Sequence, residues 1–147
     1  MTKNAIWIVD SDRDDRELIE NIFQEAQLPY TLQFFDTGPA LLKCLNEVKE
    51  APFIILCDVN LPAMHGFELR EKLLATPNKK FHSVPFIFWS NAASEHQIEQ
   101  AYKLMCHGFF VKESNYDEWK VSLLHIIGYW QKSKTPSKLE APDKSLI

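Results

Sequence analysis

Four chemically active side chains each follow a short apolar run of the kind that forms a buried strand. They are Asp10, Asp58, Ser90 and Lys112. Two carboxylates brought together resist ionising unless a cation lies beside them. Mg²⁺ binds one or two carboxylates and leaves positions for phosphate oxygens, while an ammonium group and a hydroxyl suit the same oxygens. These residue types therefore indicate phosphoryl transfer, in which a carboxylate can itself be the nucleophile.

Five apolar runs, which are expected to be strands, alternate with amphipathic stretches along the chain. The runs are residues 5–9, 30–35, 53–57, 86–89 and 109–111. All but the second are continuously apolar, which predicts strands buried on both faces, whereas the second partly alternates and suits an edge strand. In the amphipathic stretches apolar residues recur at helical spacing, as in Ile98, Ala101, Tyr102 and Met105. The pattern predicts an α/β fold with five parallel strands and five helices, (βα)5.

The predicted strands would form a doubly wound sheet, because right-handed crossovers place helices on both faces. In the flavodoxin-like strand order 2-1-3-4-5, the first and third strands are neighbours at the point where the order reverses. We therefore expect Asp10 and Asp58 to lie side by side at the carboxyl edge of the sheet, flanked by Ser90 and Lys112.

The composition is that of one ordinary globular domain. The chain has 147 residues, of which 46% are apolar, and a net charge of −4. The acidic balance argues against nucleic acid as a partner. Three cysteines without a paired spacing predict buried free thiols in a reducing cytoplasm. The apolar runs are too short to span a membrane, so no membrane association is expected.

The sequence divides into a domain over residues 1–131 and a polar segment over 132–147. That segment carries four Lys against Glu140 and Asp143, with few apolar residues, and is predicted to be a flexible tail. At the other end, Asp12 is a candidate N-cap for the first helix. The charged stretch 12–16, which includes Asp14 and Asp15, is interpreted as the solvated first turn of that helix.

Several segments resemble the receiver domain of bacterial two-component response regulators over about residues 4–131. The most specific one begins at Asp58 and reads Asp-Val-Asn-Leu-Pro-Ala-Met-His-Gly. Supporting segments are Ile-Val-Asp at 8–10, Trp-Ser-Asn at 89–91 and Gly-Phe-Phe-Val-Lys at 108–112. The stretches 12–18 and 110–118 are similar to a stand-alone subgroup that includes regulators paired with bacterial phytochromes.

The resemblance implies a role for each matching residue. Asp58 would accept a phosphoryl group from a phosphohistidine on a sensor kinase or phosphotransfer protein, with Lys112 binding a phosphoryl oxygen. Mg²⁺ would be held by Asp58, Asp10 and the backbone carbonyl of Asn60. Ser90 and Phe109 would act as the switch and alter the face formed by the fourth helix, fifth strand and fifth helix.

Two positions depart from the family pattern. Ser11 stands where a second acidic residue commonly contacts the metal, which predicts weaker Mg²⁺ binding or a shifted role for Asp10 or Asp12. Glu113 follows Lys112 where the family usually has a cis proline. A cis bond is costly for a residue other than proline, so whether this bond is cis or trans stays open.

The leading hypothesis is therefore a single-domain response regulator that signals by protein contact. It is expected to be a phosphoacceptor and not an enzyme, apart from self-catalysed phosphoryl transfer and slow dephosphorylation. A homodimer is left open, and no DNA-binding helix-turn-helix fits after residue 131. One alternative is a receiver-like binding module that works without phosphate, as Ser11 and Glu113 suggest. Another is a haloacid-dehalogenase-type phosphatase with Asp10 as nucleophile, since Asp10-Ser11-Asp12 resembles the motif of those enzymes.

Overall fold

A computed structural model describes residues 5–138 of the chain. Five strands and five α-helices alternate in it, with two short 3₁₀ helices. The strands are β1 (Ala5–Val9), β2 (Thr31–Phe35), β3 (Ile54–Asp58), β4 (Phe86–Ser90) and β5 (Gly108–Val111). The helices are α1 (Arg13–Glu25), α2 (Gly38–Cys44), α3 (Gly66–Ala75), α4 (Glu95–Lys103) and α5 (Tyr116–Lys132), with η2 (Lys79–Phe81) and η3 (Pro136–Lys138).

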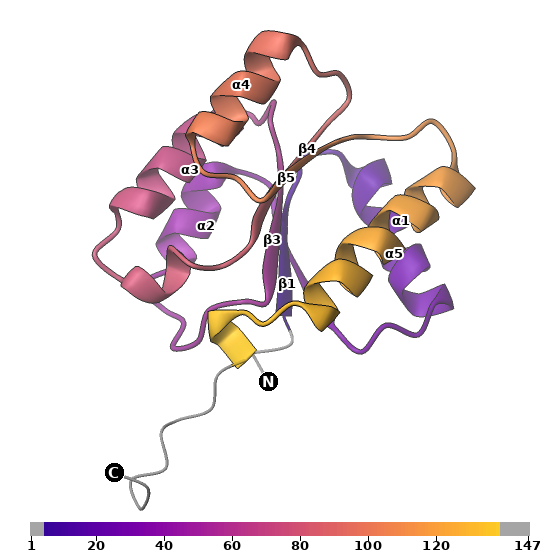
Figure 1. Ribbon diagram of the computed structural model, residues 1–147, viewed down its shortest axis with the longest axis horizontal. Coiled ribbons are helices and arrows are strands. Elements are labelled where there is room, and N and C mark those ends of the chain that lie inside the picture. The colour runs from indigo at the N-terminus through magenta and orange to yellow at the C-terminus, as the bar shows by residue number, and fades with distance from the viewer. Residues whose placement is uncertain (1–4, 139–147) are drawn as a thin grey trace, which may run out of the picture.

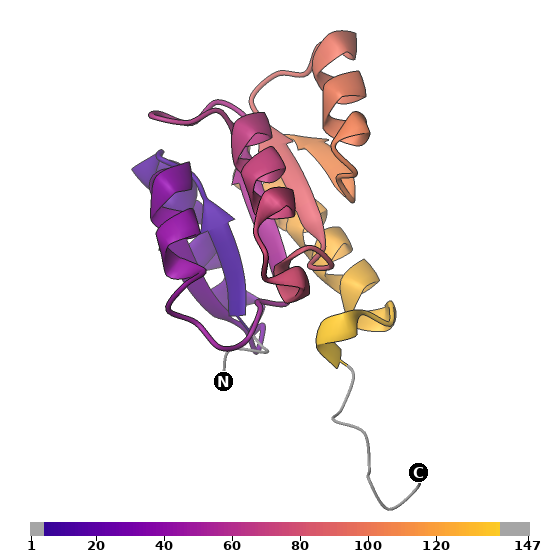
Figure 2. The same ribbon diagram turned by 90° about the vertical axis from the view of Figure 1, so that its left-hand side faces the viewer.

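The strands form one parallel sheet in the order β2-β1-β3-β4-β5, which confirms the predicted fold (Figure 1). Helices α2, α3 and α4 lie on one side of the sheet, and α1 and α5 lie on the other (Figure 1, Figure 2). Alternate residues of β1 point to opposite faces, so Trp7 joins the core beneath α2 and α3 while Ile6 and Ile8 join the core beneath α1 and α5.

Local signals in the sequence fix where the helices begin. Asp12 caps α1 by accepting hydrogen bonds from the backbone N–H groups of Asp14 and Asp15. Thr37 caps α2, and Ser94 forms a capping box with Gln97 at α4. Within residues 5–138, no helix is long and apolar enough to cross a membrane.

The edge of the sheet at β5 is more exposed than the sequence predicts. Phe109 and Phe110 are only half-buried, and Val111 is exposed, although the run was expected to be buried on both faces. The predicted stripe of the fourth helix differs in the same way, because Ala101 is buried while Ile98 and Tyr102 are exposed. Met105, which the stripe included, is also exposed and lies beyond the end of α4, with a positive φ of 60°. The cause is position: β5 is the last strand, and α4 rests on it through a small alanine.

The chain also continues to pack beyond the end of α5, where a flexible tail was expected. Thr135 is buried, and the Lys138 ammonium donates hydrogen bonds to the carbonyls of Trp130, Gln131 and Ser133. A lysine at this point satisfies carbonyl groups that the end of a helix leaves free. The rest of the predicted tail, residues 139–147, lies outside the described part of the chain.

Candidate functional site

The parallel ladder brings the strand-end residues together. Val9 pairs with Cys57, so Asp10 and Asp58 follow in register on neighbouring strands. The backbone N–H of Asp10 continues the ladder by donating to the carbonyl of Phe35 at 3.0 Å. On the other side, the N–H of Lys112 donates to the carbonyl of Ser90 at 2.7 Å. The sheet itself therefore fixes the backbone of the predicted site.

The centre of the site is the ammonium group of Lys112. Its Nζ lies 3.0 Å from Oδ2 of Asp10 and 2.9 Å from Oδ2 of Asp58. All three side chains are largely shielded from water, with 2% of the Lys112 side chain exposed, 5% of Asp10 and 10% of Asp58. Salt therefore screens these charges far less than it screens an ion pair at the surface.

Each of the two aspartates is also held by the loop that follows it. Oδ1 of Asp10 accepts a hydrogen bond from the N–H of Asp12 at 2.8 Å. Oδ1 of Asp58 accepts one from the N–H of Asn60 at 3.1 Å. Both carboxylates thus present one oxygen to their own loop and the other to Lys112. The side chain of Asp12, the further metal candidate, instead caps α1 and is exposed.

Burial and charge shift the pKa values of this cluster in opposite directions. Burial raises the pKa of Asp10 to about 6, although Lys112 and the Asp12 N–H act to lower it. Burial alone would lower the pKa of Lys112, but hydrogen bonds to Asp15 and Asp58 and the charge of Asp10 raise it above its usual range. The ammonium therefore stays charged, and the negative charge of Asp10 is incompletely compensated.

The donor set fits a hard divalent cation. Asp10 and Asp58 offer two carboxylates, and the raised pKa of Asp10 indicates that a second positive charge beside it would be favourable. Across residues 5–138, no three His, Cys, Asp or Glu side chains converge as a metal site built from side chains alone would require. Mg²⁺ does not need such a group, because it keeps several waters and accepts a backbone carbonyl such as that of Asn60.

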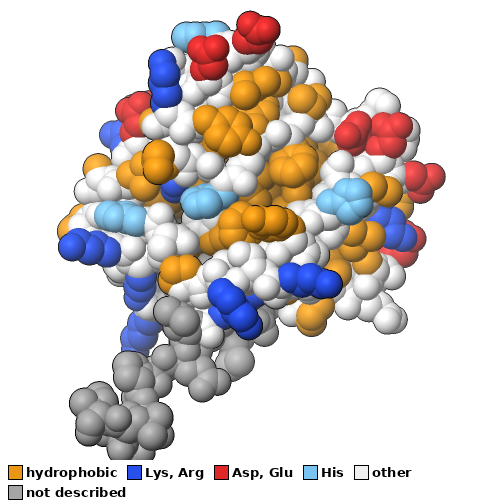
Figure 3. All heavy atoms as spheres, in the orientation of Figure 1, with side chains coloured by type: hydrophobic (Ala, Val, Ile, Leu, Met, Phe, Trp, Pro, Cys, Tyr) orange, Lys and Arg blue, Asp and Glu red, His pale blue; other side chains and the backbone are white. Residues whose placement is uncertain are grey.

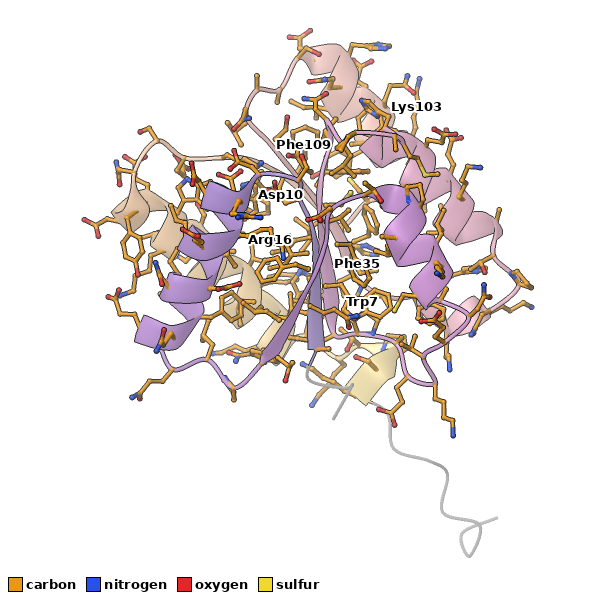
Figure 4. The ribbon with its side chains drawn as sticks, turned by 180° about the vertical axis from the view of Figure 1, so that it is seen from behind. Trp7, Asp10, Arg16, Phe35, Lys103 and Phe109 are labelled. Atoms are coloured by element: carbon orange, nitrogen blue, oxygen red, sulfur yellow. The ribbon has the colours of Figure 1, made fainter. Side chains whose placement is uncertain are left out.

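The two predicted switch residues lie on the last two strands of the sheet, Ser90 at the end of β4 and Phe109 in β5. Ser90 is fully buried, and its hydroxyl donates to the carbonyl of Ala92 at 2.7 Å. Phe109 is half-buried, with its ring 6.3 Å from that of Phe88. From behind, Asp10 and Phe109 lie toward the same end of the sheet (Figure 4). The peptide bond between Lys112 and Glu113 is trans, as the cost of a cis bond before a residue other than proline favours.

One member of the cluster was missed from the sequence. Asp15 in the first turn of α1 was interpreted as solvated, but its Oδ2 lies 2.7 Å from Nζ of Lys112. Only 18% of its side chain is exposed. The sequence signal was its place on a helix that must begin beside Asp10. Asp14 carries the same signal and remains exposed, so sequence alone could not separate the two.

Comparison with known proteins identifies the family. The family model of the response regulator receiver domain matches residues 6–123, a range that contains Asp10, Asp58 and Lys112. The chain belongs to the response regulator receiver domain family. Receiver-domain response regulators are signalling proteins of two-component systems.

Individual relatives of this receiver domain are distant. Response regulator Rcp1 of Synechocystis is 22% identical over 136 residues, covering 89% of this chain and 91% of that protein. The DNA-binding transcriptional regulator NtrC of Escherichia coli is 23% identical over 149 residues, covering all of this chain. The receiver domain spans only 30% of the length of NtrC.

Solved structures agree with the fold of this receiver domain. The phosphorylated cyanobacterial phytochrome response regulator RcpA gives a TM-score of 0.81 at 22% identity, covering 90% of this chain and 98% of that chain. The Mn²⁺-bound form of Rcp1 gives 0.77 at 19% identity, covering 95% and 99%. The predicted likeness to stand-alone, phytochrome-associated regulators is thereby confirmed.

Proposed function

We propose that this receiver domain accepts a phosphoryl group on Asp58 from a phosphohistidine of a sensor histidine kinase or phosphotransfer protein. The observation that carries the proposal is the contact of the Lys112 ammonium with both Asp58 and Asp10 at the carboxyl edge of the sheet. That arrangement combines a nearly buried nucleophilic carboxylate with a fixed positive charge, as phosphoryl transfer requires.

In the transfer step an oxygen of Asp58 attacks phosphorus. The bond between phosphorus and the histidine nitrogen breaks, and an acyl phosphate forms. Lys112 would exchange its contact with Asp58 for one with a phosphoryl oxygen, which keeps the ammonium paired. Bound Mg²⁺ would offset the negative charge of the moving group, with Asp10, Asp58 and the Asn60 carbonyl as its protein ligands. The similar protein Rcp1 has been crystallised in a form that binds Mn²⁺, another divalent cation.

The response would spread through Ser90 and Phe109. To reach a phosphoryl oxygen, the Ser90 hydroxyl must give up its bond to the Ala92 carbonyl. Phe109 lines a groove of about 520 Å³ between α4, β5 and α5, together with Tyr102, Tyr129 and Trp130. Figure 3 shows apolar side chains gathered on this face. Repacking of Phe109 would change a surface that a downstream protein or a second copy of the chain can bind.

Acetyl phosphate with Mg²⁺ tests the proposal directly. Intact-mass measurement should show one added phosphate on the wild type and none on Asp58→Asn. A Mg²⁺ titration followed by tryptophan fluorescence should show quenching, because Trp89 pairs with Asp58 across the sheet. Loss of that quenching in Asp10→Asn would assign it to the same site.

Two outcomes would overturn the proposal. A folded wild type that takes up no phosphate would favour the binding module that works without phosphate. Multiple turnovers on a chromogenic phosphate ester, retained in Asp58→Asn and lost in Asp10→Asn, would favour the phosphatase alternative.

A further inference from the structure

The Lys112 ammonium has one more carboxylate partner than the proposed chemistry uses. An ammonium group has three N–H donors, and Asp10, Asp58 and Asp15 together accept from all of them. The Asp15 contact is the shortest of the three, at 2.7 Å. It joins the first turn of α1 to the end of β5, two elements that are far apart in sequence.

A chain of hydrogen bonds sets the position of Asp15. Asp10 accepts from the N–H of Asp12, and Asp12 in turn accepts from the N–H groups of Asp14 and Asp15, at 2.8 and 3.3 Å. The first turn of α1 is thus built onto the side chain of Asp10. Because this turn is anchored at the site, the Asp15 carboxylate reaches Lys112 from a fixed backbone.

We propose that Asp15 is a positioning residue of the phosphoacceptor site, which holds the Lys112 ammonium in place while Asp58 and Asp10 change partners. The inference rests on the proposed function. Phosphorylation would convert the Asp58 carboxylate into an acyl phosphate and so remove its negative charge. A bound divalent cation would take the Asp10 carboxylate as a ligand. Asp15 takes part in neither event, so its contact with Lys112 would remain.

The charge of the cluster supports the same assignment. Asp10, Asp15 and Asp58 carry three negative charges against the single positive charge of Lys112. The remaining charge of about −2 is the charge that one divalent cation neutralises. Ser11, which stands where the family pattern has an acidic residue, is exposed and contributes none. Asp15, which comes from α1, therefore brings the carboxylates that contact Lys112 to three.

A merely structural role for Asp15 would be a favourable charge at the start of a helix. Asp14 has that role too, since it lies in the same first turn, but its side chain is exposed and forms no ion pair with Lys112. Asp14→Asn is therefore the matched control for Asp15→Asn. Asp15→Glu keeps the charge and tests rescue.

The first experiment follows the lysine ammonium by ¹⁵N-correlated NMR in metal-free protein. The Lys112 resonance is assigned by its loss in Lys112→Gln. Asp15→Asn should shift it or broaden it through faster hydrogen exchange, and Asp14→Asn should leave it unchanged. An unchanged Lys112 resonance in folded Asp15→Asn would overturn the inference, whatever the protein's activity.

The second experiment measures the rate of Asp58 labelling by acetyl phosphate at saturating Mg²⁺. Asp15→Asn should slow labelling about tenfold, because a displaced Lys112 ammonium would no longer be positioned to contact the phosphoryl oxygen. Asp15→Glu should recover part of the rate, and Asp14→Asn should stay within about twofold of the wild type. Equal rates for the two Asn variants would overturn the inference. A wild type that is not labelled would reject the proposed function, and the ammonium resonance would still report the Asp15 contact.

Discussion

Gly66 lies directly against the main chain of Asp58. A Cβ atom at Gly66 would be 2.5 Å from the carbonyl oxygen of Asp58 and 3.0 Å from Cα of Val59. The N–H of Gly66 also donates to the carbonyl of Val59 at 2.8 Å. The first turn of α3 is therefore packed on the backbone that carries the proposed phosphoacceptor, and only a residue without a side chain fits there.

Gly66→Ala should consequently displace the loop after β3. We expect the variant to lose about 2–3 kcal/mol of unfolding free energy, because the clash is with backbone that cannot rotate away. Labelling of Asp58 by acetyl phosphate should slow as well. Gly128→Ala in α5 is the control, since its Cβ would meet nothing within 4 Å. It should stabilise the protein by about 0.5–1 kcal/mol. If Gly66→Ala and the wild type had equal unfolding free energies in a urea titration, the close packing of Gly66 on Asp58 would be contradicted.

The positive charge of Lys112 offsets the repulsion among the carboxylates of Asp10, Asp15 and Asp58 in the folded state. Lys112→Gln leaves Asp10, Asp15 and Asp58 facing one another without their shared partner. We expect a loss of about 3 kcal/mol in metal-free buffer, because removing one member of a buried ion pair strands the others. Adding Mg²⁺ should recover more stability in this variant than in the wild type.

An exposed ion pair provides the control for that measurement. Lys120 pairs with Glu25 between α5 and α1, where 30% of the Lys120 side chain and 54% of the Glu25 side chain are exposed. Lys120→Gln should change stability little and should not alter the effect of Mg²⁺. If the two lysine variants behaved alike in a denaturant titration with and without Mg²⁺, the cluster around Lys112 would not be a buried electrostatic unit.

The fold and most of the site could be predicted because the sheet is parallel. Once residues 5–9 and 53–57 are identified as adjacent buried strands, the ladder forces Asp10 and Asp58 to the same edge. Lys112 follows from the same reasoning applied to β5. The sequence resemblance then assigned roles to these positions, and the comparisons confirmed the family.

The features that could not be predicted depend on which way a helix face points and on packing between elements that are distant in sequence. Asp14 and Asp15 have the same charge in the same helical turn, and only the rotation of α1 against the sheet decides which one meets Lys112. The burial of Thr135 likewise depends on the path of the chain after α5, which composition does not record. The exposure of Tyr102 follows from the edge position of β5, which periodicity does not reveal. Periodicity also extended the helix to Met105, which lies beyond the end of α4.

Arg70 links α3 to the end of α4. Its guanidinium is buried and lies 4.9 Å from the centroid of the Phe86 ring. Nε donates a hydrogen bond to the carbonyl of Leu104 at 3.0 Å, and Nη2 donates one to the carbonyl of Met105 at 2.8 Å. Arg70→Met keeps the apolar stem but leaves both carbonyls unsatisfied. We expect a loss of about 2–3 kcal/mol and faster amide exchange confined to α4 and the turn after it.

Arg16 provides a contrast for Arg70. It lies over the Phe34 ring and pairs with Asp36, but the Asp36 side chain is 69% exposed. Arg16→Met should leave amide exchange in α4 unchanged. Hydrogen-exchange mass spectrometry of peptides from residues 95–105 separates the two variants. If the amides of α4 exchanged equally slowly in Arg70→Met and Arg16→Met, Arg70 would not hold the end of that helix.

The raised pKa of Asp10 predicts how stability depends on pH. Burial raises this pKa from 3.8 to about 6, so the native state holds the Asp10 proton more tightly than the unfolded state does. Between about pH 4 and pH 6 the native protein binds more protons, and the Asp10 contribution to the unfolding free energy therefore falls as the pH rises through that window. Above about pH 6 both states have lost the proton, and the contribution is level.

Asp10→Asn isolates this effect from the titration of the other carboxylates. In metal-free buffer the variant should become more stable relative to the wild type by about 2 kcal/mol between pH 4 and pH 7, because it lacks the buried charge. Chemical unfolding of both proteins across this range gives the difference. Mg²⁺ should reduce it in the wild type, since a cation beside Asp10 favours the ionised carboxylate. Parallel stability curves for the two proteins would mean that Asp10 is already fully compensated by Lys112, and the argument for a cation at this position would fail.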